Sequence, residues 1–270
     1  MDPHLRSIME RVDEVESQSF FSLYEDAPAE LNAGSHAEGA VSVVWLGSYE
    51  DAGFSAISRI DLADDPDGTL ERILRILRQA GVRLIGMDDH PDMPPTFDRA
   101  WFAARGFEPD YQEQIWWRPL DDVAPRSEPE GVRVERATAA DRETFALVLN
   151  EGFGAEPETG LGRAYAAVIG KAGWLHYIAY VDDEPGAAAA LFIADGVADC
   201  FIAGTRPAAR QRGAQTALIN RRLLDGRAAG CDIATAQSVT YNASLRNFER
   251  RGFRPVYRRT IYARRLDTPE

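Results

Sequence analysis

Residues 200–218 read CFIAGTRPAARQRGAQTAL, a stretch that joins a strand, a loop and a helix. The apolar strand ends at Thr205, a basic loop follows, and Gly213 opens a helical pattern. The first turn of a helix carries unpaired backbone N–H groups and a positive potential, so it suits a phosphate. Glycine at 213 lets the backbone approach closely, and Arg210 and Arg212 add positive charge. The pattern predicts a pyrophosphate site, with a tight turn beside solvated arginines as the alternative; neither a P-loop nor a G-x-G-x-x-G motif is present.

Strand and helix patterns surround that stretch throughout the second half of the chain. In chain order we expect a strand at 132–136, helices at 141–150 and 162–169, strands at 174–181, 187–193 and 197–205, a helix at 211–229, a strand at 232–236, a helix at 243–251 and a strand at 253–263. Residues 182–186 (DDEPG) are typical of a hairpin turn. This order predicts an α/β (α+β) fold, a mixed sheet flanked by helices.

The end of the first half resembles the end of the second. Residues 101–120 read WFAARGFEPDYQEQIWWRPL and residues 247–266 read NFERRGFRPVYRRTIYARRL, with nine of twenty positions identical at an offset of 146. A period of domain size indicates that a whole folding unit was duplicated. The segment 121–131 (DDVAPRSEPEG) lacks periodic apolar residues, so we expect domains at 1–125 and 130–270.

Composition narrows the classes of function. A chain of 270 residues suits two domains, and its net charge of −13 disfavours binding to nucleic acid while mildly favouring a cationic substrate such as an amine. No apolar run of about 18 residues or signal-peptide pattern is present, so we expect a cytoplasmic protein with no membrane partner. Cys200, Cys231 and four scattered histidines do not have the spacing of a metal site, and we expect none.

A more specific pattern combines two pieces of the second half. RQRGAQ at 210–215 lies between a strand and a long helix, and NASLRNFERRGF at 242–253 fits N-x-S-x-x-N-x-x-R-x-G-F. Together they resemble the GNAT superfamily of N-acetyltransferases, over about residues 132–264. The resemblance implies acetyl-CoA as the acetyl donor. With the duplication, it implies two tandem GNAT-like units of which the N-terminal copy is degenerate.

The resemblance also implies which residues bind CoA. The pyrophosphate would lie on the N–H groups of residues 211–216, and the pantetheine would pair with the preceding strand. The implied cofactor-binding residues are Ala203, Gly204, Thr205, Arg210, Gln211, Arg212, Gly213, Ala214, Gln215, Thr216, Asn242, Ser244 and Asn247. Two residues depart from the family's pattern. Gln215 replaces a usual glycine or alanine, so its side chain must turn away from the phosphate, and Phe248 replaces the usual tyrosine acid.

The expected reaction is direct attack of an amine on the thioester. An amine with a pKa near 10 must lose a proton first, and the resemblance places the general base at Asp199, with an arginine-paired or partly exposed strand carboxylate as the alternative. The N–H of Ala203 could hold the oxyanion. A thiolate with a pKa of about 8.5 leaves without strong help from an acid. Tyr257 and Tyr241 are candidate acids in place of Phe248, with a packing role for Tyr257 as the alternative.

The first half lacks the basic loop. Residues 64–68 read DDPDG where the second half carries its arginines, and carboxylates repel a pyrophosphate. We therefore expect the first half not to bind CoA but to cover an edge of the second half and shape the amine pocket. The alternatives to an N-acetyltransferase are a catalytically weak CoA-binding or partner-binding module, and a tandem transferase that takes aminoacyl groups from tRNA. The sequence does not identify the amine, and it leaves a homodimer open.

Overall fold

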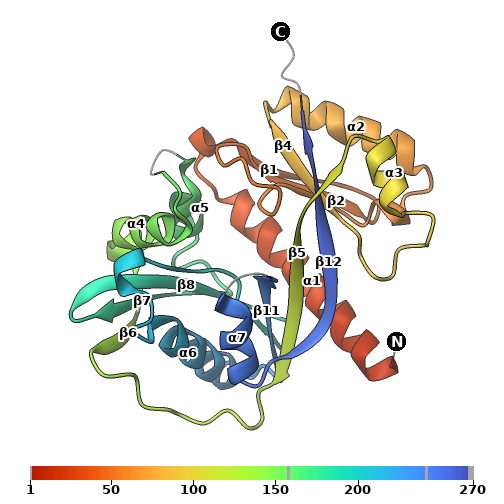
Figure 1. The fold of residues 1–270 in the computed structure, drawn as a ribbon. Helices are drawn as coiled ribbons and strands as arrows, with labels where there is room; N and C mark the ends of the chain where they lie inside the picture. The colour runs from red at the N-terminus through yellow and green to blue at the C-terminus, as the bar shows by residue number, and fades with distance from the viewer. Residues whose placement is uncertain (1, 157–158, 241–242, 267–270) are drawn as a thin grey trace.

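The computed structural model describes residues 2–156, 159–240 and 243–266, and their strands form one continuous mixed sheet (Figure 1). The strand order is β1-β2-β3-β4-β12-β5-β11-β9-β8-β7-β6, and β10 pairs with β8. Helices pack on both faces. In the second half, His176 of β7 packs with the cluster beneath α4 and α5, whereas the next residue, Tyr177, packs beneath α6. The predicted α/β fold, a mixed sheet flanked by helices, is confirmed.

The elements of the first half are α1 (Pro3–Glu25), β1 (Ala33–Glu38), β2 (Val41–Leu46), β3 (Ala56–Ser58), α2 (Pro66–Gln79), β4 (Leu84–Asp88), α3 (Arg99–Ala104) and β5 (Glu108–Pro119). Those of the second half are β6 (Val132–Arg136), α4 (Arg142–Phe153), α5 (Leu161–Ala167), β7 (Trp174–Val181), β8 (Glu184–Ala194), β9 (Val197–Asp199), β10 (Ala203–Thr205), α6 (Ala214–Ala228), β11 (Ile233–Val239), α7 (Ala243–Arg250) and β12 (Arg254–Arg265). Strands β6 and β7 have the bounds that the sequence predicts.

The strand predicted at 197–205 is divided in two. Strand β9 runs parallel to β11, whereas β10 pairs only with β8 among the described strands. The hydrogen bonds change sides between them: the N–H of Cys200 donates to Thr235, and the carbonyl of Ile202 accepts from Ala190. The sheet therefore parts between β10 and β11, which leaves one edge of β10 without a strand partner in the described part of the chain.

The two halves exchange their last strands. Strand β12 ends the second half but lies between β4 and β5, and β5 ends the first half but lies between β12 and β11 (Figure 1). The register pairs Glu113 with Arg259, which stand at equivalent positions of the repeat. A pseudo-twofold axis thus passes between these two strands. The segments 1–125 and 130–270 each supply a strand to the other's part of the sheet.

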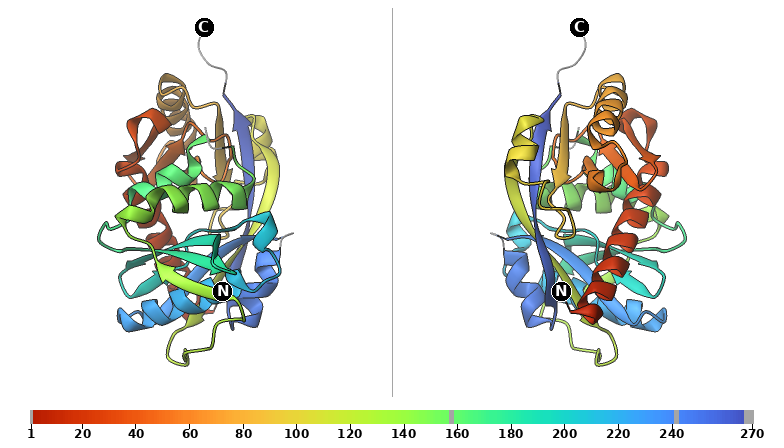
Figure 2. Two further views of the ribbon diagram at one scale, coloured as in Figure 1. Left: turned by 90° about the vertical axis from the view of Figure 1, so that its left-hand side faces the viewer. Right: turned by 90° about the vertical axis from the view of Figure 1, so that its right-hand side faces the viewer.

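Helix α1 joins both halves as well. Its buried positions, among them Ile8, Val12, Val15 and Leu23, recur every three or four residues and form one apolar face. This face packs in one cluster with second-half residues such as Phe145, and the right-hand view of Figure 2 shows the helix lying along the sheet. Although α1 has 23 residues, neither it nor any other helix of the described residues is long and apolar enough to cross a membrane.

Candidate functional site

A groove of about 1050 Å³ lies where the sheet parts, and both halves form its walls. The second half contributes residues 201–205, 209–211, 213–216 and 237–239, together with Gly152, Phe153, Tyr165, Asn247 and Arg250. The first half contributes Phe20, Tyr49, Asp51, Gly53, Phe54, Asp110, Tyr111 and Glu113. The split strands and the basic loop therefore face side chains that come from the other copy of the repeat.

The loop before α6 has the conformation of an anion-binding turn. Gln211 and Gly213 have φ angles of 63° and 88°, and the helix begins at Ala214 rather than at the predicted residue 211. The carbonyl of Gly213 accepts from the N–H of Ala217, so the N–H groups before Ala217 have no partner within the helix. A β-carbon at 213 would lie 2.7 Å from the side chain of Pro129, so glycine is required here for space as well as for φ.

The arginines of this loop have different surroundings. Arg210 lines the groove and donates to the carbonyls of Thr205 and Gly152, each at 3.3 Å. Arg212 does not line it, because its guanidinium donates to the carboxylate of Asp182 at 2.8 Å. Arg250 of α7 lines the groove instead. The sequence indicates Arg250 only as part of the motif at 242–253; the structure places it in the wall of the groove.

Strand β10 presents its unpaired edge to the groove. Ala203, Gly204 and Thr205 all line the groove. Helix α4 packs tightly against this strand, and a β-carbon at Gly152 would lie 2.6 Å from the Thr205 nitrogen. The outer edge of β10 has no strand partner among the described residues, and Arg210 donates to the Thr205 carbonyl on it, so this edge could pair with an extended ligand.

The other predicted donor-site residues are only partly described. Ala214, Gln215, Thr216 and Asn247 line the groove, whereas Asn242 and the side chain of Ser244 lie outside the described residues, as does Tyr241. The side-chain oxygen of Gln215 is buried and accepts no hydrogen bond from the described residues. An orphaned acceptor beside a row of free amides fits a ligand that has both a phosphate and an amide N–H, as CoA does.

Asp199 does not lie in the groove. Its side chain is 1% exposed, it lines neither the groove nor the second cavity of the molecule, and Ser19 and Glu16 of α1 lie beside it. Burial raises the pKa of Asp199 to about 8, the Glu16 carboxylate adds to the rise, and Ser19 and Arg222 oppose it. The family resemblance places the general base here, with a partly exposed or arginine-paired carboxylate as the alternative. In the structure the side chain is buried beside α1 and has no ion pair among the described residues, and a carboxyl with this pKa is mostly protonated at pH 7.

Tyr257 lines the second cavity rather than the groove. Its hydroxyl donates to a carboxylate oxygen of Asp13 at 2.6 Å, and burial raises the pKa of Tyr257 far above its usual range. This position does not bring the hydroxyl to the loop that begins at Gln211. Phe248, at the family's tyrosine position, is buried against Trp116 and Phe253.

The first-half wall of the groove carries three carboxylates. Asp51 is partly buried and Asp110 is exposed. The negative charge of Glu113 is largely balanced by Arg259, whose guanidinium is paired with it at 2.9 Å. Burial raises the pKa of Asp51, although the N–H of Gly53 donates to one of its oxygens at 2.8 Å and opposes that rise. The sequence analysis identified none of these three, because they belong to the first half of the chain and only the tertiary fold brings them to the groove.

Comparisons with solved structures agree with this arrangement. The chain is similar to a GCN5-related N-acetyltransferase from Kribbella flavida at 17% identity and a TM-score of 0.65, covering 93% of this chain and 94% of that one. A GCN5-related N-acetyltransferase from Sphaerobacter thermophilus matches at 14% identity and a TM-score of 0.61, covering 85% and 78%. A tandem GNAT protein from the clavulanic acid biosynthesis pathway matches at 13% identity and a TM-score of 0.60, covering 96% and 89%.

Sequence comparison adds nothing to these similarities. No protein-family model matches the chain, and no curated protein matches it. The solved structures share the fold with this chain at low identity, and they establish that it has the GNAT fold in a tandem arrangement, as the motifs indicate. A fold can carry several activities, so the activity must be argued from the groove.

Proposed function

We propose that the protein transfers an acetyl group from acetyl-CoA to a cationic amine bound in the groove between the two halves. The observation that carries the proposal is the opposition of two walls. One wall is the left-handed turn at 211–213 that opens α6, and the other holds the carboxylates of Asp51, Asp110 and Glu113. The first wall suits a diphosphate and the second an ammonium ion.

The donor would lie along the second-half wall. The N–H groups of residues 211–216 would hold the pyrophosphate, and Arg210 and Arg250 would supply positive charge. The free edge of β10 would pair with the pantetheine amides, and the orphaned oxygen of Gln215 would accept from an amide N–H. When bound, acetyl-CoA supplies a thioester whose C–S bond breaks as the C–N bond to the amine forms, and the sulfur leaves as a thiolate.

The acceptor would lie against the first-half wall, with Asp51 as the general base. Burial raises the pKa of Asp51 above its ordinary value, which favours a carboxylate that accepts a proton. Glu113 is tied to Arg259, and Asp110 is exposed. Asp51 would take the proton that the ammonium ion loses before attack and pass it to solvent. The N–H of Ala203 remains our proposal for the donor to the oxyanion.

Asp199 and Tyr257 have no contact with the acceptor in this proposal. Asp199 would act through the packing of β9 against α1, and Tyr257 through its hydrogen bond to Asp13. The first half would not bind CoA. Asp65 caps α2 by accepting the N–H of Gly68 at 3.0 Å, so a carboxylate already occupies the helix terminus at which a pyrophosphate would lie.

The proposal is tested by thiol release from acetyl-CoA over a panel of small amines. We expect Asp51→Asn to lower kcat by about 10²–10⁴-fold without changing the affinity for CoA, because only the proton acceptor is lost. Glu143→Gln, which removes an exposed carboxylate of α4, is the matched control and should behave as wild type. A wild-type kcat for Asp51→Asn would remove the residue from the role of base.

Donor binding is measured separately by calorimetry with CoA. Arg210→Glu should weaken the affinity by at least about tenfold, and by more than Arg212→Glu does, because Arg212 is paired with Asp182 outside the groove. A chain that does not bind CoA would overturn the proposal. A chain that binds CoA but acetylates none of the amines would support the alternative, a CoA-binding module without catalysis.

A further inference from the structure

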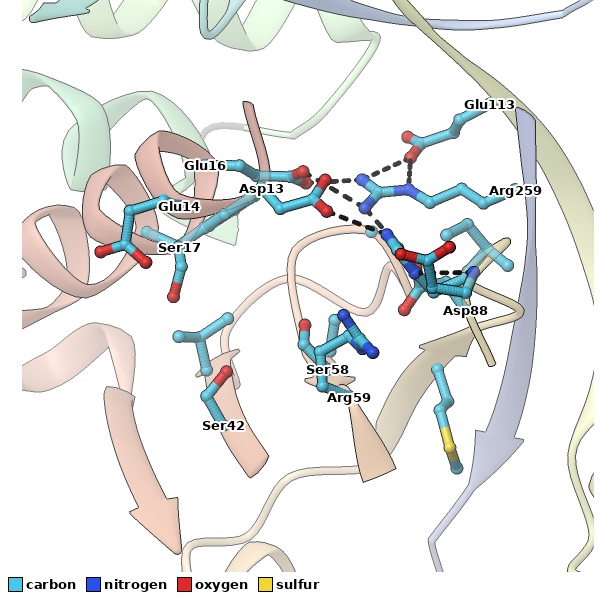
Figure 3. A pocket seen from close by; sticks show the side chains of 18 of the residues that line it. Asp13, Glu14, Glu16, Ser17, Ser42, Ser58, Arg59, Asp88, Glu113 and Arg259 are labelled. Atoms are coloured by element: carbon cyan, nitrogen blue, oxygen red, sulfur yellow. Dashed lines mark hydrogen bonds and ion pairs between the residues drawn. The ribbon is translucent and has the colours of Figure 1, made fainter. Parts of the chain in front are cut away.

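A second cavity, of about 330 Å³, lies between α1 and the first-half sheet (Figure 3). Its walls are formed by α1, the ends of β3 and β4, and the middle of β12. It is the first half's counterpart of the groove. Tyr257 and Arg259 of β12 line the cavity, and Tyr111 and Glu113 of β5 line the groove at equivalent positions of the repeat.

Negative charge is in excess around this cavity. The guanidinium of Arg259 lies 2.5 Å from Glu16, 2.9 Å from Glu113 and 3.6 Å from Asp88, and none of the four side chains is more than 13% exposed. These three carboxylates therefore share the guanidinium of Arg259. Arg59 also lines the cavity, but its guanidinium is already paired with Asp61 at 3.0 Å. Asp13 adds a fourth carboxylate, whose partners are the hydroxyl of Tyr257 and the imidazole of His90. Charges held in a site of low dielectric constant attract a counter-charge strongly.

Among these carboxylates, Asp88 has the fewest polar contacts. The residue is 8% exposed and lines the cavity, its carboxylate accepts no hydrogen bond from the described residues, and its ion-pair partner among them is Arg259, at 3.6 Å. A buried carboxylate without a hydrogen-bond donor is costly, so native proteins rarely leave one. Figure 3 shows Asp88 on one side of the hollow, Ser17 and Ser42 on the other, and Ser58 and Arg59 between them.

The chemistry of the lining favours an organic cation. No group of three described His, Cys, Asp or Glu residues could hold a metal ion. The hydroxyls of Ser17, Ser42 and Ser58 can accept from a ligand's N–H groups, and Met9, Val44 and Met87 can pack against its carbon atoms. The volume is at the small end of ligand pockets. We propose that this cavity binds a small organic ammonium ion, whose N–H groups donate to Asp88 and to the neighbouring carboxylates.

The cavity adjoins the groove. Phe20, Gly53 and Glu113 line both. The same ammonium group has two sources: the far end of a diamine whose other amine reaches the groove, or a free cation that occupies the cavity alone. Both sources give the same contacts with Asp88, and only the first depends on the acetyl transfer proposed above.

The site is tested on the full chain without CoA, by calorimetry at constant ionic strength with 1,4-diaminobutane and n-butylamine as probes and butyrate as the anionic control. We expect one saturable site for an ammonium probe and none for butyrate. Asp88→Asn, which keeps the shape and removes the charge, should weaken binding by at least about tenfold. Glu143→Gln should leave it unchanged. No saturable binding of either ammonium probe up to about 10 mM would overturn the site.

A second variant covers the case in which Asp88→Asn fails to fold. Glu14 lines the same cavity from an exposed position on α1, so Glu14→Gln should fold and weaken binding several-fold. Wild-type binding by Glu14→Gln would overturn the site when Asp88→Asn is unfolded, and wild-type binding by a folded Asp88→Asn would overturn it outright.

The two sources give different results. A diamine that binds tighter than n-butylamine, and whose KM for acetylation rises in Asp88→Asn while that of n-butylamine does not, identifies the far end of the acceptor. Equal binding of both probes without acetylation of either identifies a free cation. Arg210→Glu separates the two proposals, because it should weaken CoA binding without weakening diamine binding.

Discussion

Arg259 holds the exchanged strand β12 to three other elements. Its guanidinium is paired with Glu16 of α1, Glu113 of β5 and Asp88 of β4. Arg259→Met keeps most of the side-chain volume and removes the charge, which leaves three carboxylates in a nearly dry site. Breaking a buried ion pair by removing one partner costs about 3–5 kcal/mol. We expect the free energy of unfolding of Arg259→Met to be lower than that of the wild type by this amount at pH 8, which corresponds to a fall in Tm of roughly 10 °C.

The loss should depend on pH. Burial raises the pKa of Glu16, and Arg259 opposes that rise, so the variant should have a still higher pKa at Glu16. A carboxyl whose pKa is higher in the folded state than in the unfolded state contributes stability that is present at low pH and is lost as the pH rises through the folded value. The difference between wild type and variant should therefore be larger at pH 8 than at pH 5.5. Urea unfolding followed by tryptophan fluorescence measures the free energy of unfolding of both proteins at each pH.

The neighbouring arginine supplies the control. Arg258 is exposed and donates to the side chain of Gln114 at 3.0 Å, so Arg258→Met should cost less than about 1 kcal/mol at either pH. If Arg258→Met and Arg259→Met unfold at the same urea concentration at pH 8, the ion pairs of Arg259 with its three carboxylates do not hold β12 in place. A loss that is equal at pH 5.5 and pH 8 would show that charge is not its cause.

Three further outcomes are expected. Gly213→Ala should lower Tm more than Gly170→Ala does, and it should also weaken CoA binding. Both positions have φ near 90°, but only at 213 would the new β-carbon meet a proline side chain, at 2.7 Å. Equal Tm values for the two variants would refute the clash. Asp182→Asn should tighten CoA binding about two- to fivefold in calorimetry, because it frees Arg212 for the diphosphate, and unchanged or weaker binding would contradict this. The free energy of unfolding of Asp199→Asn should increase relative to that of the wild type as the pH rises from about 4 to 8. Burial raises the pKa of Asp199 to about 8, so the wild type loses the stability of the protonated carboxyl over that range, and the asparagine variant does not. If urea unfolding gives the two proteins the same dependence of stability on pH, the reasoning is contradicted.

The sequence alone determined the features that depend on neighbouring residues. The strand–loop–helix order around 200–218 predicted the basic loop and the helix start to within three residues, because glycine and helical periodicity act over one or two helical turns, whereas the positive φ of Gln211 was found only in the structure. Strands β6 and β7 had their predicted bounds for the same reason. The offset of 146 between the halves also predicted the tandem arrangement of the fold, since it needs only a comparison of the chain with itself.

Only the tertiary structure decided which side chains meet. It placed α1 over Asp199, and it brought Asp51 and Glu113 of the first half to the groove that the second half opens. The exchange of β5 and β12 set the pairing of Glu113 with Arg259. Burial and charge contacts of this kind join residues that are far apart in the chain, so no local spacing encodes them, and the pKa of a carboxyl follows from what packs over it and not from its own segment.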